Sequence, residues 1–306
     1  MLTDAQLAAL AFVRARGGGR YDTDAAITIN FHPDRTAGDR TVIEGLLADG
    51  RFRSQFETGI SNGGLTAYPG GDRDRWEERM FGGAYQRPGV MAIDRPKYGA
   101  LNVFHHPDGA APRFGSAYLR LRPAVLERAT YTFGDSYRDP AEFGTIDAFS
   151  AVLHGLERHW GASALTGPRS PLPGRALDDY VEAQVHGPVD LATDVSALVL
   201  DTAFRDTACA SVAVAVTARY GVPVEWRDGF RIAPADVPEE FRGPEVPPLA
   251  VHLCSFYERD LVDAELIGRA ARAVVATPGE WARWGTPAET LTLLKYLWHV
   301  LVQHGH

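Results

Sequence analysis

Residues 176–188 read Ala-Leu-Asp-Asp-Tyr-Val-Glu-Ala-Gln-Val-His-Gly-Pro. In a strand, successive side chains point to opposite faces of the sheet. The valines and the terminating Gly187-Pro188 favour a strand over the rival helix, in which Asp178 and Glu182 lie one turn apart. We expect either a ligand-facing carboxylate cluster or a hydrogen-bonded rim strand. In both cases one face carries the polar residues Asp178, Tyr180, Glu182, Gln184 and His186.

The elements expected around this strand give the fold class. Period-2 patterns predict strands at 26–31, 98–104, 113–121 and 128–133, with the last three consecutive in an antiparallel meander. Helical spacing and end signals predict helices at 3–17, 39–49, 143–160, 191–200, 207–220, 260–276 and 287–304. A short strand is predicted at 222–226. We therefore predict an α+β fold, in which helices flank a mixed, largely antiparallel sheet and the C-terminal part is helical.

The composition fits a globular protein with a sizeable core. The chain has 306 residues, of which 45% are hydrophobic and 23% charged, and we expect one α+β catalytic domain over 1–306 with a soft boundary near 190. The N-terminus lacks the layout of a secretory signal, and no apolar run is long enough to span a bilayer. Cys209 and Cys254 lie in apolar contexts. We expect reduced, buried thiols in a cytoplasmic protein, without a zinc site.

The net charge of −8 argues against nonspecific polyanion binding. A local basic surface remains an alternative, because arginines gather in one segment. Either these side chains form one basic strip on adjacent strands, or they pair with surface carboxylates. The residues concerned are Arg113, Arg120, Arg122 and Arg128, with Arg95 and Lys97 just before them.

Several polar residues stand where strands meet loops, which is where binding sites are often built. In 26–31, Ile27, Ile29 and Phe31 are expected to point inward, so Asn30 and the following His32 point outward. Ser116 follows a glycine, as a nucleophile can. No GxSxG elbow surrounds it, which favours a structural serine.

The motif Asp178-Asp179-x-x-Glu182 resembles the DDxxE motif of the arginine-containing cyclodipeptide synthases, a family formerly known as a domain of unknown function. The pattern of residue types in segments 55–64, 76–85, 95–102 and 113–121 is also similar to that family. The resemblance implies an aminoacyltransferase that makes a cyclo(arginine–X) diketopiperazine from arginyl-tRNA and a second aminoacyl-tRNA. An aminoacyl ester is already activated, so neither a metal nor another cofactor is obligatory.

The resemblance also implies roles for individual residues. Carboxylates suit the task of holding a guanidinium, positioning an ammonium and removing a proton, which assigns catalysis to Glu182, Asp178 and Asp179. The tRNA would meet Arg113, Arg120 and Arg122. Substrate-binding roles fall to Tyr180, Gln184, His186, His32, Asn30, Tyr98 and Ser116.

Two rival interpretations remain open. In ADP-ribosyl transfer, a β-rich fold presents one catalytic glutamate, while a histidine and a tyrosine elsewhere grip NAD. His32, Tyr98 and Glu182 fit those three parts. The other rival is a binding protein without catalytic activity.

Overall fold

The computed structural model describes residues 1–59, 66–138, 140–161, 177–178 and 180–306. Its centre is an eight-stranded sheet with the order β12-β11-β6-β1-β5-β9-β7-β8, in which only the β11/β12 pair is parallel. The prediction of a mixed, largely antiparallel sheet in an α+β fold is therefore confirmed. The strands are β1 (Ile27–Phe31), β5 (Lys97–Leu101), β6 (Ala117–Leu121), β7 (Ala129–Phe133), β8 (Phe143–Thr145), β9 (Val181–Val185), β11 (Val195–Asp201) and β12 (Val224–Arg227).

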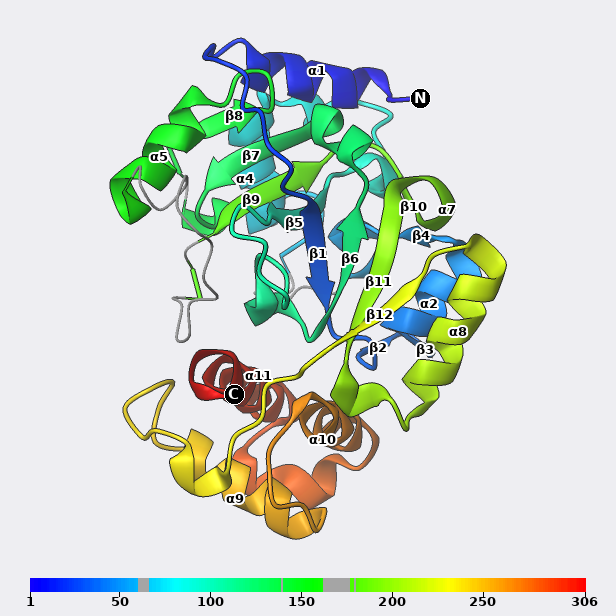
Figure 1. Cartoon of the computed structure of the whole chain (residues 1–306), viewed down its shortest axis with the longest axis vertical. Helices are drawn as coiled ribbons and strands as arrows, with labels where there is room; N and C mark the ends of the chain where they lie inside the picture. The colour runs from blue at the N-terminus through cyan, green and yellow to red at the C-terminus, as the bar shows by residue number, and fades with distance from the viewer. Residues whose placement is uncertain (60–65, 139, 162–176, 179) are drawn as a thin grey trace.

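Helices cover the sheet and extend beyond one end of it (Figure 1). In that view α1 and α5 lie at the top, α2 packs beside α8 at the right, and α9, α10 and α11 form a helical lobe at the bottom with the C-terminus. The helices are α1 (Asp4–Arg14), α2 (Val42–Asp49), α3 (Gln55–Thr58), α4 (Asp72–Phe81), α5 (Ser150–Trp160), α7 (Leu191–Asp194), α8 (Ala208–Tyr220), α9 (Val246–Phe256), α10 (Ala264–Ala276) and α11 (Pro287–His304). Two small ladders join β2 (Thr36–Ala37) to β3 (Arg40–Thr41) and β4 (Arg51–Phe52) to β10 (Val189–Asp190).

Local signals account for many of the boundaries. Thr3 and Gln6 form the capping box that begins α1, and Thr286 caps α11 with the help of Glu289. Gly50 ends α2 with a φ of 68°, a left-handed conformation that glycine adopts without strain.

Three predicted elements are wrong. β5, β6 and β7 form no meander, because β5 and β6 both flank β1 while β7 pairs with β8 and β9. Residues 143–160 begin as β8 and become helical only at Ser150. Residues 191–200 are mostly β11, not helix. β11 is buried at nearly every position, and such a continuous apolar run is as typical of a buried strand as of a helix.

The two faces of β9 differ as predicted. Val181, Ala183 and Val185 belong to the largest apolar cluster of the described residues, while Glu182 and Gln184 point to the opposite face. That cluster runs from β1 through to α11, so the sheet and the C-terminal helices share one core. Cys209 and Cys254 are free and buried, as expected. Among the described residues, no helix is both long and apolar enough to cross a membrane.

The sheet divides in the middle, between β1 and β5. These two strands pair only at Ile27↔Leu101 and Thr28↔Ala100, whereas β1 pairs with β6 at four positions and β5 with β9 at five. The pairing does not continue past these positions, and Asn30 of β1 and Tyr98 of β5 line an opening between the two strands. We call this opening the fork. It leaves a space inside the sheet, with β1 on one side and β5 and β9 on the other.

Candidate functional site

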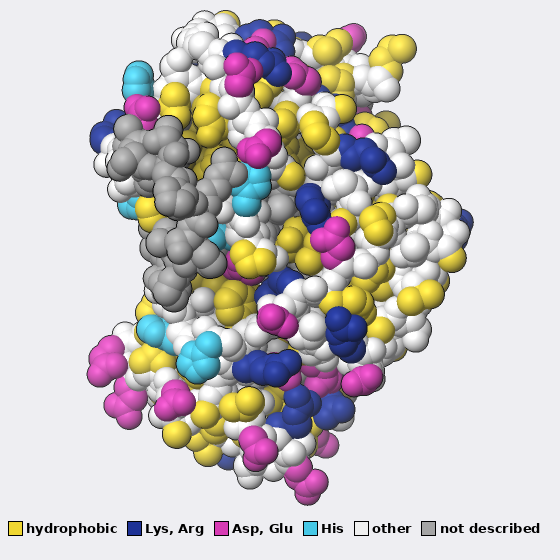
Figure 2. All heavy atoms as spheres, in the orientation of Figure 1, with side chains coloured by type: hydrophobic (Ala, Val, Ile, Leu, Met, Phe, Trp, Pro, Cys, Tyr) yellow, Lys and Arg dark blue, Asp and Glu magenta, His cyan; other side chains and the backbone are white. Residues whose placement is uncertain are grey.

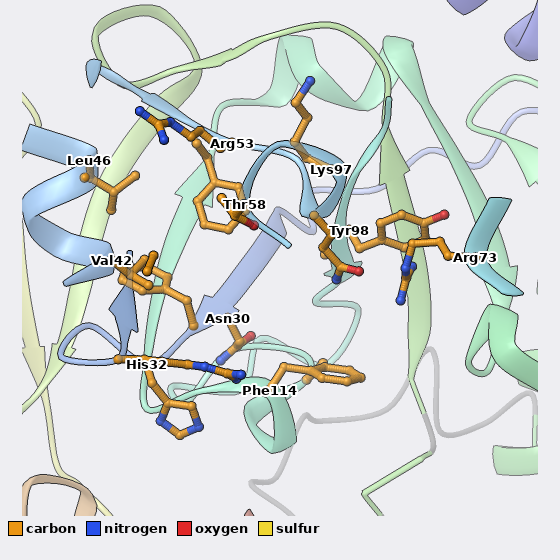
Figure 3. Close-up of a pocket in the computed structure, with 18 of the residues that line it drawn as sticks. Asn30, His32, Val42, Leu46, Arg53, Thr58, Arg73, Lys97, Tyr98 and Phe114 are labelled. Atoms are coloured by element: carbon orange, nitrogen blue, oxygen red, sulfur yellow. The ribbon is translucent and has the colours of Figure 1, made fainter. Parts of the chain in front are cut away.

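A pocket of about 700 Å³ occupies the fork, which is within the usual range for small-molecule sites. Figure 3 shows Val42 and Leu46 of α2 on one side of the hollow and Tyr98 and Arg73 on the other. Side chains from both sheet halves and from α11 line it. They include Asn30, His32, Arg35, Tyr98, Arg113, Phe114, Asp135, Tyr137, Glu182 and Lys295.

Glu182 is the buried carboxylate of the pocket. It stands between Ala100 on β5 and Thr132 on β7, and only 5% of its surface is exposed. The amide of Gln184 donates to Oε1 over 2.9 Å, and the backbone N–H of Ser136 donates to Oε2 over 3.3 Å. Burial, reinforced by the negative charge of Asp135, raises the pKa of Glu182 to about 7. Near neutral pH this carboxyl group therefore exchanges its proton readily, as a general base must.

A series of buried hydrogen bonds leads through Gln184 to Glu182. Because the Gln184 amide nitrogen donates to Glu182, its oxygen accepts from the Thr130 hydroxyl over 2.7 Å. Thr130 Oγ1 lies 3.1 Å from His186 Nε2, and His186 Nδ1 lies 2.6 Å from the Tyr85 hydroxyl. Burial lowers the pKa of His186 to about 3, so the ring is neutral. The only consistent tautomer then carries its proton on Nε2, and every donor in the chain points toward Glu182.

Tyr98 is held by a second buried network. Its hydroxyl donates to Glu77 over 2.8 Å, and Glu77 pairs with Arg95 at 2.8 Å. Arg95 also pairs with Asp74 at 2.6 Å. Burial raises the pKa of the Tyr98 phenol well above its ordinary value, so Tyr98 stays a neutral donor. The guanidinium of Arg73 lies over the Tyr98 ring, 4.3 Å from its centroid. The ring is thus fixed against the pocket wall.

His32 lines the opposite side of the pocket, directly after β1. Its ring meets the edge of Trp298 on α11 at a centroid distance of 5.1 Å. Burial, with the positive charge of Arg35, lowers the pKa of His32 to about 3. The imidazole is therefore neutral and suits hydrogen bonding to a ligand. The neighbouring Asn30 donates to the Asp108 and Gly115 carbonyl oxygens, so its amide also braces the loop beside β1.

The remaining predicted residues are distributed as follows. Tyr180 is buried with Ala100 against the edge of Phe114, close to Glu182. Asp178 pairs with Arg113 and, over 2.8 Å, with Arg138, so its charge is already matched by two arginines. Asp179 lies outside the described residues. Ser116 and His186 are fully buried and do not line the pocket.

The arginine segment does not form one exposed strip. Arg95 and Lys97 are buried, and Arg113 turns into the pocket. Arg120 pairs with Glu225, and Arg128 pairs with Asp194 at 3.0 Å. On the face shown in Figure 2, acidic and basic side chains are interspersed. The alternative expectation, that these arginines pair with carboxylates, therefore holds for Arg113, Arg120 and Arg128.

Some pocket residues were not predicted. Asp135 follows Gly134 directly at the end of β7, and this strand-then-glycine pattern was a usable signal. Lys295 was not found, because it lies on an ordinary amphipathic helix. The chain has only two lysines, Lys97 and Lys295, and both line the pocket. Within the described residues no group of three or more His, Cys, Asp or Glu side chains is placed to hold a metal ion.

The geometry defines a class: an α+β protein with a divided sheet, whose fork holds a ligand-sized pocket around one buried glutamate. The chain belongs to the family described as "Protein of unknown function (DUF3626)", whose model matches residues 26–165 and 156–304. It is 38% identical over 98 residues to a "Gene 2 protein" of Mycobacterium phage D29, covering 31% of this chain and 32% of that protein. It is 29% identical over 170 residues to a "Gene 2 protein" of Mycobacterium phage L5, covering 50% of this chain and 59% of that protein. The matches thus span less than two thirds of these relatives.

Proposed function

We propose that this chain uses NAD to transfer an ADP-ribosyl group, with Glu182 as the catalytic carboxylate. One observation carries the proposal. The fork brings His32, Tyr98 and Glu182, which come from three different strand ends and lie far apart in sequence, around a single pocket. These are the three residue types that such a reaction needs.

The charges of the pocket complement those of NAD. Glu182 and Asp135 add carboxylates to the pocket, and Tyr98 and Tyr137 add aromatic rings. These groups suit the nicotinamide, which is aromatic and positively charged. Arg35, Arg113 and Lys295 add cationic side chains, which suit the negatively charged diphosphate. NAD, with a cationic ring at one end and two phosphates in the middle, matches both sets of groups.

The same residues suit the chemistry of the transfer. The glycosidic bond from ribose C1′ to the nicotinamide nitrogen breaks, and its electron pair leaves with the neutral nicotinamide. The positive charge that develops on the ribose is stabilised by the Glu182 carboxylate. An oxygen or nitrogen nucleophile then bonds to C1′, and Glu182 receives its proton. With water as the nucleophile the products are nicotinamide, ADP-ribose and a proton.

The test is the release of nicotinamide from NAD by the purified chain, followed by chromatography. Isothermal calorimetry with NAD supplies the binding constant. We expect saturable NAD binding and slow hydrolysis even without an acceptor. An absence of NAD binding at millimolar concentration would contradict the proposal.

A second candidate is the formation of cyclo(arginine–X) from arginyl-tRNA and another aminoacyl-tRNA, as the DDxxE resemblance implies. The observation that favours it is the pKa of Glu182 near 7, because an α-ammonium must lose a proton before it attacks an ester. Against it, Asp178 is already paired with Arg113 and Arg138, so recognition of the substrate guanidinium would fall to Asp179 or Glu182.

Incubation with charged tRNAs, followed by mass spectrometry for cyclic dipeptides, tests this candidate. In that case Arg120→Glu with Arg122→Glu is expected to weaken binding of charged tRNA and to reduce its salt dependence. Cyclic products without NAD turnover would select the second candidate. Neither product would favour a binding protein without catalytic activity.

A further inference from the structure

A group of cationic side chains gathers where α11 meets the pocket, and one of them, Arg113, pairs with Asp178. Arg35, Arg113 and Lys295 line the pocket. Burial and then the charges of Arg113, Arg242 and Arg35 lower the pKa of Lys295, and the opposing effect of Asp135 is smaller. Burial and Arg113 likewise lower the pKa of Arg242. Like charges that lower one another's pKa repel, and an anion bound between them relieves that repulsion.

Buried polar atoms in the same place have no partner among the described residues. These are Nε of Arg113, Nε of Arg242 and Nδ1 of His299. His299 is only 2% exposed, and burial together with the neighbouring Arg242, Arg113 and Lys295 lowers its pKa to about 2. Its ring is neutral and offers a hydrogen bond without adding to the repulsion. Unpaired buried polar groups are uncommon in folded proteins, and a missing ligand is one explanation for them.

The surrounding contacts hold these groups in place. The indole N–H of Trp298 donates to the Pro112 carbonyl oxygen over 2.9 Å, which ties α11 to the turn Pro112–Phe114 that carries Arg113. Arg113 lies over the Phe114 ring at 4.9 Å, and Arg242 lies 6.0 Å from the centroid of Tyr296. The cations therefore come from the segment after β1, from this turn and from the C-terminal helical part.

We infer that Lys295, Arg113 and Arg35, backed by Arg242 and His299, form a diphosphate-binding subsite. The ligand class is the diphosphate of a dinucleotide, so the assignment of NAD rests on the proposed function, whereas the subsite itself does not. Guanidinium groups bind phosphate oxygens in pairs, and a lysine adds a compact charge. The C-terminal helices thereby contribute directly to ligand binding.

Inorganic pyrophosphate is the direct probe, because it carries the diphosphate without a nucleoside. At low salt we expect it to bind once per chain and to raise the melting temperature. Lys295→Gln should weaken pyrophosphate binding by roughly tenfold or more, since it removes a charge-assisted contact, and Arg242→Gln should weaken binding to a lesser extent, since it removes a neighbouring positive charge. Without pyrophosphate, both variants should melt no lower than the natural chain, because each relieves repulsion. Arg283→Gln is the control, because Arg283 is exposed and lies beside Trp284. It should change neither the pyrophosphate affinity nor the melting temperature.

The outcomes separate this subsite from the proposed function. Equal pyrophosphate affinity in the natural chain, Lys295→Gln and Arg242→Gln would overturn the subsite, as would no binding to the natural chain. NAD hydrolysis whose KM is unchanged by Lys295→Gln would also overturn it. Conversely, pyrophosphate binding that these variants lose, without any NAD binding, would retain the subsite and reject NAD as the substrate. A single-stranded oligonucleotide that displaces pyrophosphate more strongly than ADP-ribose would assign the subsite to nucleic acid and overturn the dinucleotide.

Discussion

Gln184 donates a hydrogen bond to Glu182 from two residues along the same strand, over 2.9 Å. A strand places such residues on one face, so this contact needs no help from the rest of the fold. The amide favours the charged form of Glu182, whereas burial favours the neutral form and is the larger effect. The resulting pKa near 7 sets the behaviour of the site.

Replacing Glu182 with Gln should reduce the turnover of NAD by ~10²-fold or more, because the amide keeps the shape but neither carries charge nor accepts a proton. The measurement is nicotinamide release at saturating NAD. Asp190→Asn, at the β10–α7 junction and outside the pocket, is the control. Near-full activity in a folded Glu182→Gln protein would remove Glu182 from the mechanism.

Glu182 should also make the protein less stable as the pH rises. Its pKa is raised from 4.5 to about 7 on folding, so the folded state binds the proton more tightly than the unfolded state. The stabilisation is complete below about pH 4.5 and is lost as the pH rises through 7. Glu182→Gln lacks this dependence, and the difference in unfolding free energy between the two proteins should change by roughly 2–4 kcal/mol across this range. Urea titrations at pH 5 and pH 8 measure it, and parallel curves would contradict the assigned pKa.

Thr130→Val should raise the pKa of Glu182 and shift the acid limb of the pH–rate profile upward. The substitution keeps the volume but removes the hydroxyl that fixes the Gln184 amide, so Gln184 no longer donates reliably to Glu182. Thr290→Val is the matched control. Thr290 is equally buried, but its hydroxyl donates to the carbonyl oxygen of Thr286, the N-cap residue of α11. If Thr130→Val lowers the stability but leaves the pH–rate profile unshifted, the hydrogen bonds behind Glu182 stabilise the fold and do not tune the pKa of Glu182.

Glu77→Gln should destabilise the protein by roughly 3–5 kcal/mol, because it leaves Arg95 buried with one carboxylate fewer. The Tyr98 hydroxyl also loses its charged acceptor, so KM for NAD should rise. Glu78→Gln tests the same chemical change at the adjacent exposed position of α4 and should be nearly neutral. If both variants unfold at the same urea concentration as the natural chain, the network contributes little to stability.

The sequence was sufficient to predict a strand or helix where the signal lay within the element itself. Period-2 alternation identified β9 and placed Glu182 and Gln184 on one face, a capping box identified α1, and apolar residues at helical spacing identified α11. Helical propensity misled at 191–200, because a strand covered on both faces lacks the alternation that identifies an exposed strand. Sequence also suggested His32, Tyr98 and Glu182 as partners, but not the fork that unites them. That fork depends on where two strands stop pairing, a tertiary property with no local signature.

The arginine strip was wrong for a related reason. Sequence placed Arg95 and Lys97 near other cations, but it could not show that Arg95 is neutralised by Asp74 and Glu77 from α4. Pairings between residues about 20 positions apart are set by packing rather than by strand period. Lys295 was missed because its importance comes only from the neighbours that the fold gives it, whereas Asp135, directly after Gly134 at the end of β7, had a local signal that was not used.

The scarcity of lysine makes the pocket chemically addressable. Lys97 and Lys295 are the only side-chain amines in these 306 residues, and the low pKa of Lys97, about 8, leaves much of it as the nucleophilic free amine in mild base. An amine-reactive label therefore has two possible side-chain targets, both in the wall of the same pocket. Protection of these two amines, read by peptide mass spectrometry, would report occupancy of the pocket by any ligand, whatever reaction the protein catalyses.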